Sequence, residues 1–153
     1  ALDKSPEVSA EMACDKHVVK MILESAQMLC TAHHHYDMFT NVPYKKAHYN
    51  HPSTIWVREN CENYAWLYRH MLALGKEYTI RYGKTHLSIT KCKEPLGETP
   101  PDMPWLGFTQ SPQCMPDEFK CDDYVEAYRE YYRKAKSHIL QWTGRPTPDW
   151  IVA

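Results

Sequence analysis

The feature that most constrains the fold is a long stretch, from Pro6 to His34, in which apolar residues recur at helical spacing. Ser5 before Pro6 supplies an N-cap followed by a proline in the first helical turn. The pattern therefore predicts a helix over residues 6–34. Its buried side would carry the apolar stripe formed by Val8, Met12, Val19, Ile22 and Leu29.

Two further helices are predicted, over residues 54–83 and 122–142. Gly83 is typical of a helix C-terminus, and Asp122 or Asp123 can cap the third helix. The six prolines between residues 93 and 117 prevent regular structure there. No segment has the pattern of a strand. We therefore expect an all-α fold in which residues 1–153 form a single compact domain of three main helices with long irregular connections.

Polar side chains at positions 17, 20 and 24 interrupt the apolar pattern of the first helix. Steps of three and four residues place His17, Lys20 and Glu24 on one helical face. One interpretation is an ion pair between Lys20 and Glu24 on a solvated stripe. The other is the wall of a cleft that presents a working carboxylate, because such groups need partners or water in apolar surroundings.

Composition bears on whether the chain binds nucleic acid, spans a membrane or is secreted. The chain has 18 Lys and Arg against 19 Asp and Glu, so its net charge of −1 gives no general attraction to nucleic acid. No stretch is long and apolar enough to span a membrane, and no secretory signal is evident. The six cysteines are interpreted as reduced thiols in the cytoplasm. We expect a monomer.

Cys30, His33 and His34 are candidate metal ligands, because a cysteine and a histidine four residues apart share a helical face. Cys14 and His17 form a second, looser pair. Closed zinc sites need four ligands, and no further pair with matching spacing follows. We therefore predict neither a metal nor another cofactor.

A compact basic segment ends the second predicted helix and contains Arg81, Tyr82 and Lys84. Its cations could hold a phosphate. Alternatively, they could simply complement the negative end of the helix dipole. The sequence leaves both interpretations open.

The order of motifs resembles one known family. Asp15-x-His17 is followed by Glu24 at seven residues, then a long helix, a Pro-rich stretch, a third helix and a closing Arg145-Pro146-Thr147. This arrangement resembles the phage pyrimidine-dimer DNA glycosylase family of the endonuclease V type. The chain also resembles uncharacterised phage-encoded proteins that share the segments His-Val-Val-Lys-Met, here residues 17–21, and Met-Pro-Asp-Glu-Phe-Lys, here residues 115–120.

The first resemblance implies a glycosylase and abasic-site lyase that acts on DNA in an infected cell. In that family an N-terminal amine attacks C1′ of the damaged nucleotide, an acidic residue of the first helix assists, and a histidine contacts the substrate. Glu24 and His17 match the last two positions. Ala1 or Lys20 would supply the amine, and Leu23 stands where the family has an arginine.

The remaining expected contacts are to DNA. Basic residues would hold phosphates, and Trp56 or Tyr82 would stack on an extruded base. The basic residues are Lys45, Arg58, Arg81, Lys84 and Arg145. Two other functions fit the same residues: a transferase that modifies a pyrimidine base or nucleotide, and a non-catalytic interaction module in which the charged stripe is structural.

Overall fold

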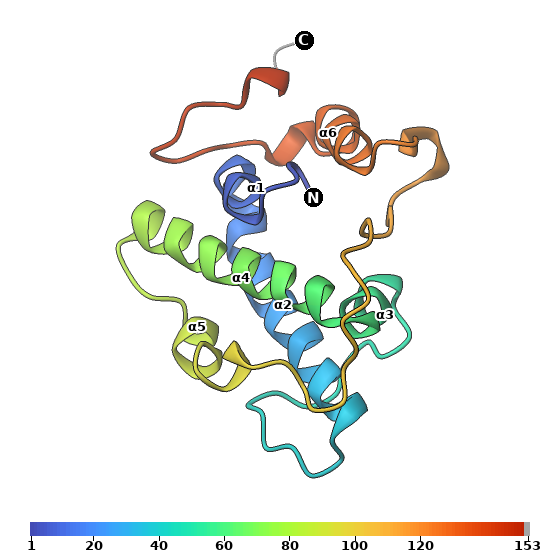
Figure 1. Ribbon diagram of the computed structural model, residues 1–153. Coiled ribbons are helices and arrows are strands. Elements are labelled where there is room, and N and C mark those ends of the chain that lie inside the picture. The colour runs from blue at the N-terminus through green and yellow to red at the C-terminus, as the bar shows by residue number, and fades with distance from the viewer. Residues whose placement is uncertain (152–153) are drawn as a thin grey trace.

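The computed structural model describes residues 1–151, and within that range it contains six α-helices, four short 3₁₀ turns and no strand. The expected all-α fold is confirmed. α2 (Asp15–Tyr36) and α4 (Cys61–Tyr82) are the two long helices, and α4 crosses α2 near the centre of the molecule (Figure 1). None of the helices in the described range combines the length and the apolar character needed to cross a membrane.

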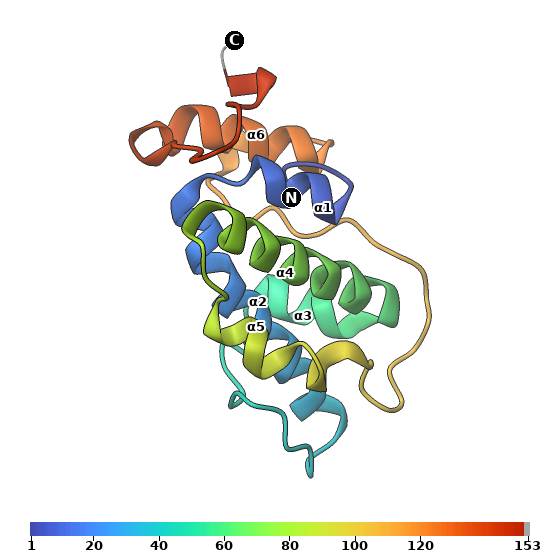
Figure 2. The same ribbon diagram turned by 90° about the vertical axis from the view of Figure 1, so that its left-hand side faces the viewer.

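The core lies where these two helices cross. Val18, Ile22 and Leu29 of α2 are fully buried, as are Met71 and Leu74 of α4. α3 (Pro52–Glu59) and α5 (Leu87–Cys92) both pack against α2, and α1 (Pro6–Met12) packs against α4. α1 and α6 (Tyr124–Ala135) lie together at one end of the bundle, as the view turned by 90° also shows (Figure 2).

The predicted helix over residues 6–34 is instead two helices, α1 and α2, with Ala13 and Cys14 extended between them. In a continuous helix the carbonyls of residues 11–13 would accept from the N–H groups of residues 15–17. Here Arg81 donates to the carbonyls of Glu11 and Ala13, and Trp142 donates to that of Met12. Side-chain donors from distant parts of the chain thus replace the backbone N–H groups of a continuous helix, and the chain turns between α1 and α2.

The predicted helix over residues 54–83 is also divided, at Asn60. This residue is extended, with φ −163° and ψ 165°, and its side-chain oxygen accepts from the Asn63 N–H at 3.0 Å. Asn60 therefore ends α3 and caps α4. At the far end of α4, Gly83 has φ 74° and stops the helix as predicted.

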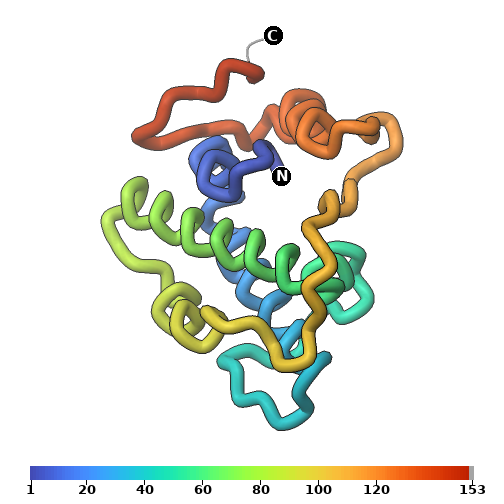
Figure 3. The backbone as a smooth tube through the Cα atoms, viewed as in Figure 1, coloured from blue at the N-terminus to red at the C-terminus, as the bar shows by residue number. Residues whose placement is uncertain are grey.

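The predicted helix over residues 122–142 is shorter than expected. Asp123 caps it, accepting from Val125 and Glu126, but α6 ends at Ala135. The following chain turns back over α1 (Figure 3). Thr143 then donates its backbone N–H and its hydroxyl to Asp15, which requires the chain to leave the helix before this point.

Candidate functional site

A pocket of about 450 Å³ lies among the N-terminal segment, α2, the start of α3, and α6. Its volume falls in the range usual for small-molecule sites. The four residues expected to carry catalysis all line it: Ala1, His17, Lys20 and Glu24. The structure therefore brings this predicted group together.

The N-terminal segment is held in place by contacts on both sides of the peptide chain. The Leu2 N–H donates to the Ser9 hydroxyl at 3.0 Å, and the Leu2 carbonyl accepts from Arg129 of α6 at 2.9 Å. Arg129 also pairs with Asp3 at 3.4 Å. These contacts position the amine of Ala1 at the pocket.

The environment of Ala1 favours the free amine. In a chain that begins at Ala1, burial lowers the pKa of its α-amine from the usual 8 to about 5, because the charged form loses hydration. Near pH 7 this group is therefore a neutral amine with an available lone pair, which is the form that acts as a nucleophile.

Lys20 and Glu24 form the open part of the pocket wall. Lys20 Nζ lies 3.9 Å from Glu24 Oε1, and their side chains are 66% and 41% exposed. The pair expected from the i, i+4 spacing is therefore present, and both groups remain accessible from solvent. Such an exposed pair contributes at most about 1 kcal/mol to stability.

His17 also lines the pocket and is linked to α6. Its Nδ1 lies 2.6 Å from the Tyr132 hydroxyl. Burial, then the charges of Lys136 and Lys20, lower the pKa of His17 to about 4. His17 is consequently neutral near pH 7.

The far wall of the pocket comes from residues that sequence reasoning did not select. They include His48, His51, Tyr131, Tyr132 and Lys136. The three from the α6 region have no local spacing that connects them with α2, since Tyr132 is 115 residues from His17. The abundance of histidine and tyrosine was the available signal, and it did not identify positions.

Arg81 belongs to a different cluster. Its side chain is fully buried, and it donates to Glu77 at 3.0 Å, to Asp15 at 3.1 Å and to the Ala13 carbonyl at 2.7 Å. Arg145 also donates to Glu77, through Nε at 3.0 Å. Burial alone would raise the pKa of Glu77, but hydrogen bonds from Arg145 and Arg81 outweigh it and the pKa is lowered. Arg81 is thus committed to protein groups and is not presented to a phosphate.

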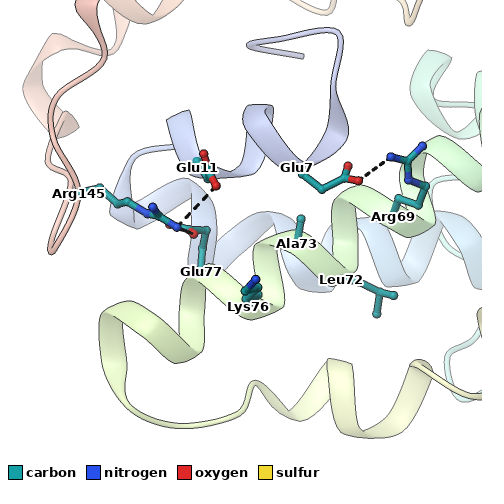
Figure 4. A pocket seen from close by; sticks show the side chains of 8 residues that line it. All are labelled: Glu7, Glu11, Arg69, Leu72, Ala73, Lys76, Glu77 and Arg145. Carbon is teal, nitrogen blue, oxygen red and sulfur yellow. Dashed lines mark hydrogen bonds and ion pairs between the residues drawn. The ribbon is translucent and has the colours of Figure 1, made fainter.

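A second hollow, of about 310 Å³, lies beside this cluster between α1 and α4 (Figure 4). Glu7 pairs with Arg69 at its one end, and Glu11 lies 3.8 Å from Arg145 at the other. Lys76 lies between them in the close-up view. Because carboxylates and cations alternate along this hollow, its charges largely offset one another.

The other residues expected to contact DNA are placed separately. Trp56 is buried, at 6% exposed, and donates through Nε1 to the Thr109 carbonyl, so its ring is not free to stack on a base. Tyr82 is exposed at the end of α4, and Lys84 follows it on the surface. Arg58 lies over the Tyr49 ring at 3.8 Å from its centroid, and Lys45 is exposed on the loop before α3.

The residues considered for a metal site have other partners. His33 Nε2 lies 2.8 Å from the Tyr64 hydroxyl, and His34 Nε2 lies 2.9 Å from the Tyr44 carbonyl. Cys30 is buried, and a hydrogen bond with Cys92 lowers its pKa. Across residues 1–151, no group of three or more His, Cys, Asp or Glu side chains is arranged to hold a metal ion.

Comparison with known proteins identifies the family. Residues 2–90 match the family model described as pyrimidine dimer DNA glycosylase, a range that includes α1 to α4 and three of the four pocket residues above. Searches of curated proteins and of solved structures find no match. The match covers more than half of the chain and confirms the resemblance noted from the sequence. The chain belongs to the pyrimidine dimer DNA glycosylase family.

Proposed function

We propose that this protein is a DNA glycosylase and abasic-site lyase that acts on a damaged or modified pyrimidine nucleotide in the 450 Å³ pocket. The proposal applies to a protein whose N-terminus is Ala1. The observation that carries it is the meeting of a neutral α-amine at Ala1 with an accessible carboxylate at Glu24 in one pocket. Family membership supports DNA as the substrate.

The first step is attack by the Ala1 amine on C1′ of the nucleotide. The new N–C1′ bond forms as the glycosidic bond breaks, and the base leaves with the bonding electrons and takes up a proton. Positive charge develops on the sugar during this step. Glu24 stabilises that charge electrostatically, which is the larger part of its role here.

The second step releases the 3′ phosphate. After the amine loses one proton, the C1′–O4′ bond breaks, O4′ takes up a proton, and a protonated imine joins Ala1 to C1′. Glu24 then removes a proton from C2′, and the electrons of that bond expel the phosphate from C3′ by β-elimination. His17, which lines the same pocket, is proposed as a substrate contact.

Ala1 is preferred to Lys20 as the amine. Lys20 is two-thirds exposed and pairs with Glu24 at 3.9 Å, whereas the Ala1 amine is buried at the pocket. Lys20 is instead proposed to orient Glu24 and to attract the DNA backbone.

The proposed phosphate contacts are cations outside the pocket: the exposed Lys45 and Lys84, with the half-buried Arg58 and Arg145 as weaker ones. Tyr82 is the proposed stacking residue. Arg81 and Trp56 are left out, because both are buried and hydrogen-bonded to protein groups.

Borohydride trapping on duplex DNA with a single abasic site tests the lyase chemistry. The protein used should begin at Ala1, verified by intact mass. We expect a covalent adduct that peptide mapping assigns to Ala1, that persists in Lys20→Ala, and that is lost when one residue is added before Ala1. An adduct on Lys20, or none where a known lyase traps, would overturn this assignment.

The same assay separates the two other functions. A base-modifying transferase predicts a changed nucleotide, lost in Glu24→Gln, without any strand break. A non-catalytic module predicts no product and no retardation of DNA at low salt.

A further inference from the structure

The hydroxyl of Tyr132 connects the pocket to α6 through His17. Tyr132 is buried, and its oxygen lies 2.6 Å from His17 Nδ1. The two rings meet edge to face, with centroids 5.1 Å apart and an interplanar angle of 68°. A short hydrogen bond and an aromatic contact together fix the orientation of the imidazole.

The direction of this hydrogen bond follows from the other partner of the hydroxyl. The Cys14 N–H donates to the Tyr132 oxygen at 3.4 Å. A tyrosine hydroxyl has one proton to donate. Burial raises the pKa of Tyr132 well above its usual value, so this proton is retained. Since a buried hydroxyl proton needs an acceptor, it is directed to His17 Nδ1.

A neutral imidazole that accepts at Nδ1 carries its own proton on Nε2. His17 is neutral near pH 7 for the reasons given above. Within residues 1–151, Nε2 has no hydrogen-bond partner, and His17 lines the pocket. The Nε2–H is therefore available to a ligand.

We propose that Tyr132 is a positioning residue that holds His17 as the Nε2–H tautomer, so that the pocket offers its ligand one fixed, uncharged N–H donor. This inference deepens the proposed function and rests on it for the nature of the ligand. A single donor selects a hydrogen-bond acceptor on the nucleotide, such as a phosphate, sugar or base carbonyl oxygen. It disfavours a nucleotide that places an N–H at that point.

The tautomer is directly measurable by ¹⁵N NMR of histidine-labelled protein at pH 7. We expect the His17 Nε2 of the wild type to be protonated and its Nδ1 to behave as a hydrogen-bonded acceptor. In Tyr132→Phe, which removes only the hydroxyl, the Nδ1–H form should become populated. Tyr124→Phe is the matched control, because Tyr124 is a buried tyrosine of α6 whose hydroxyl makes no hydrogen bond in the described residues.

A wild-type His17 with its proton on Nδ1 would overturn the proposal, and so would an unchanged His17 spectrum in folded Tyr132→Phe. The wild-type spectrum gives the direction of the bond whether or not the variant folds. These readouts need no substrate. Failure of the wild type to release a base would therefore reject the proposed function while the tautomer is still decided.

A double-mutant cycle tests the link to catalysis. Tyr132→Phe should lower the single-turnover rate about tenfold, as expected for the loss of one orienting hydrogen bond, with little change in KM. In a His17→Ala background the same change should have no further effect, because the two side chains act as one unit. Independent, multiplying effects would show that Tyr132 does not act through His17.

Discussion

Two clusters of ionisable groups meet at the start of α2: Asp15 belongs to one and His17 to the other. Asp15 joins a buried network with Glu77, Arg81 and Arg145, in which each charge has a partner of opposite sign. His17, two residues later, faces a pocket in which burial holds the imidazole and the Ala1 amine neutral. A buried ionisable group stays charged when a group of opposite charge lies beside it. Without such a group, burial favours the neutral form. The first arrangement suits structure and the second suits chemistry.

The largest expected effect comes from the pocket. Glu24→Gln should lower the single-turnover rate by about 10²–10⁴, because the proposed mechanism uses this carboxylate both to stabilise charge on the sugar and as the base for C2′. Its melting temperature should stay close to that of wild type, since Glu24 is exposed and forms only a surface pair. Glu59→Gln, an exposed carboxylate at the end of α3, is the control and should retain the wild-type rate. Equal losses in both variants would contradict the special role of Glu24.

In the buried network of Asp15, Glu77, Arg81 and Arg145, a substitution should lower stability. Arg81→Met leaves the carbonyls of Glu11 and Ala13 without their donor and Asp15 and Glu77 with one cation fewer. We expect a loss of about 3–5 kcal/mol in the free energy of unfolding, measured by chemical denaturation. Arg69→Met, which breaks an exposed pair, should cost about 1 kcal/mol or less. If Arg81→Met were stable but bound DNA weakly, Arg81 would be a phosphate ligand after all.

The pH dependence of the rate sharpens the same contrast. With a pKa of about 5, the Ala1 amine is unprotonated above pH 6. Its protonation state should therefore cause no change in the single-turnover rate between pH 6 and 8. Below pH 5 protonation removes the proposed nucleophile, and the rate should fall about tenfold per pH unit. An amine with the ordinary pKa near 8 would instead lose rate below pH 8. Quenched-flow rates across this range distinguish the two.

The contrast between the clusters also explains what the sequence could predict. The helical class, the Asp123 cap and the Gly83 stop depend on local patterns, and all three are confirmed. The common face of His17 and Glu24 follows from helical spacing. The division between α1 and α2 was missed because it depends on donors from Arg81 and Trp142, far along the chain.

The site was harder to predict than the fold for the same physical reason. Arg81 and Lys84 look equivalent in sequence, yet one lies beside buried Glu77 and the other is exposed. Tyr132 and Lys136 reach the pocket from α6 and the residue after it, more than 100 positions after α2 begins. Only the folded chain brings these groups together, so local spacing could not identify them.

A smaller effect is expected from histidines that folding keeps neutral. Burial lowers the pKa of His70 to about 4, although its Nδ1 bonds the Pro6 carbonyl. The unfolded state binds a proton near pH 6.5 and the folded state near pH 4. Stability should therefore fall as pH drops through this window, by about 1–3 kcal/mol for His70. His70→Gln, which retains a donor for Pro6, should flatten that part of the stability profile measured by urea unfolding.

The smallest expected effect concerns the exposed cations that neither cluster uses. Lys45→Ala should weaken DNA binding severalfold at low salt and reduce the slope of log K against log salt by about one, as expected for one lost phosphate contact. Lys76→Ala removes the same charge beside Glu7 and Glu11, and is the matched control. Its slope should equal that of wild type, because a cation among carboxylates releases few ions from DNA. Equal changes in both variants would mean that only net charge, and not the position of Lys45, governs binding.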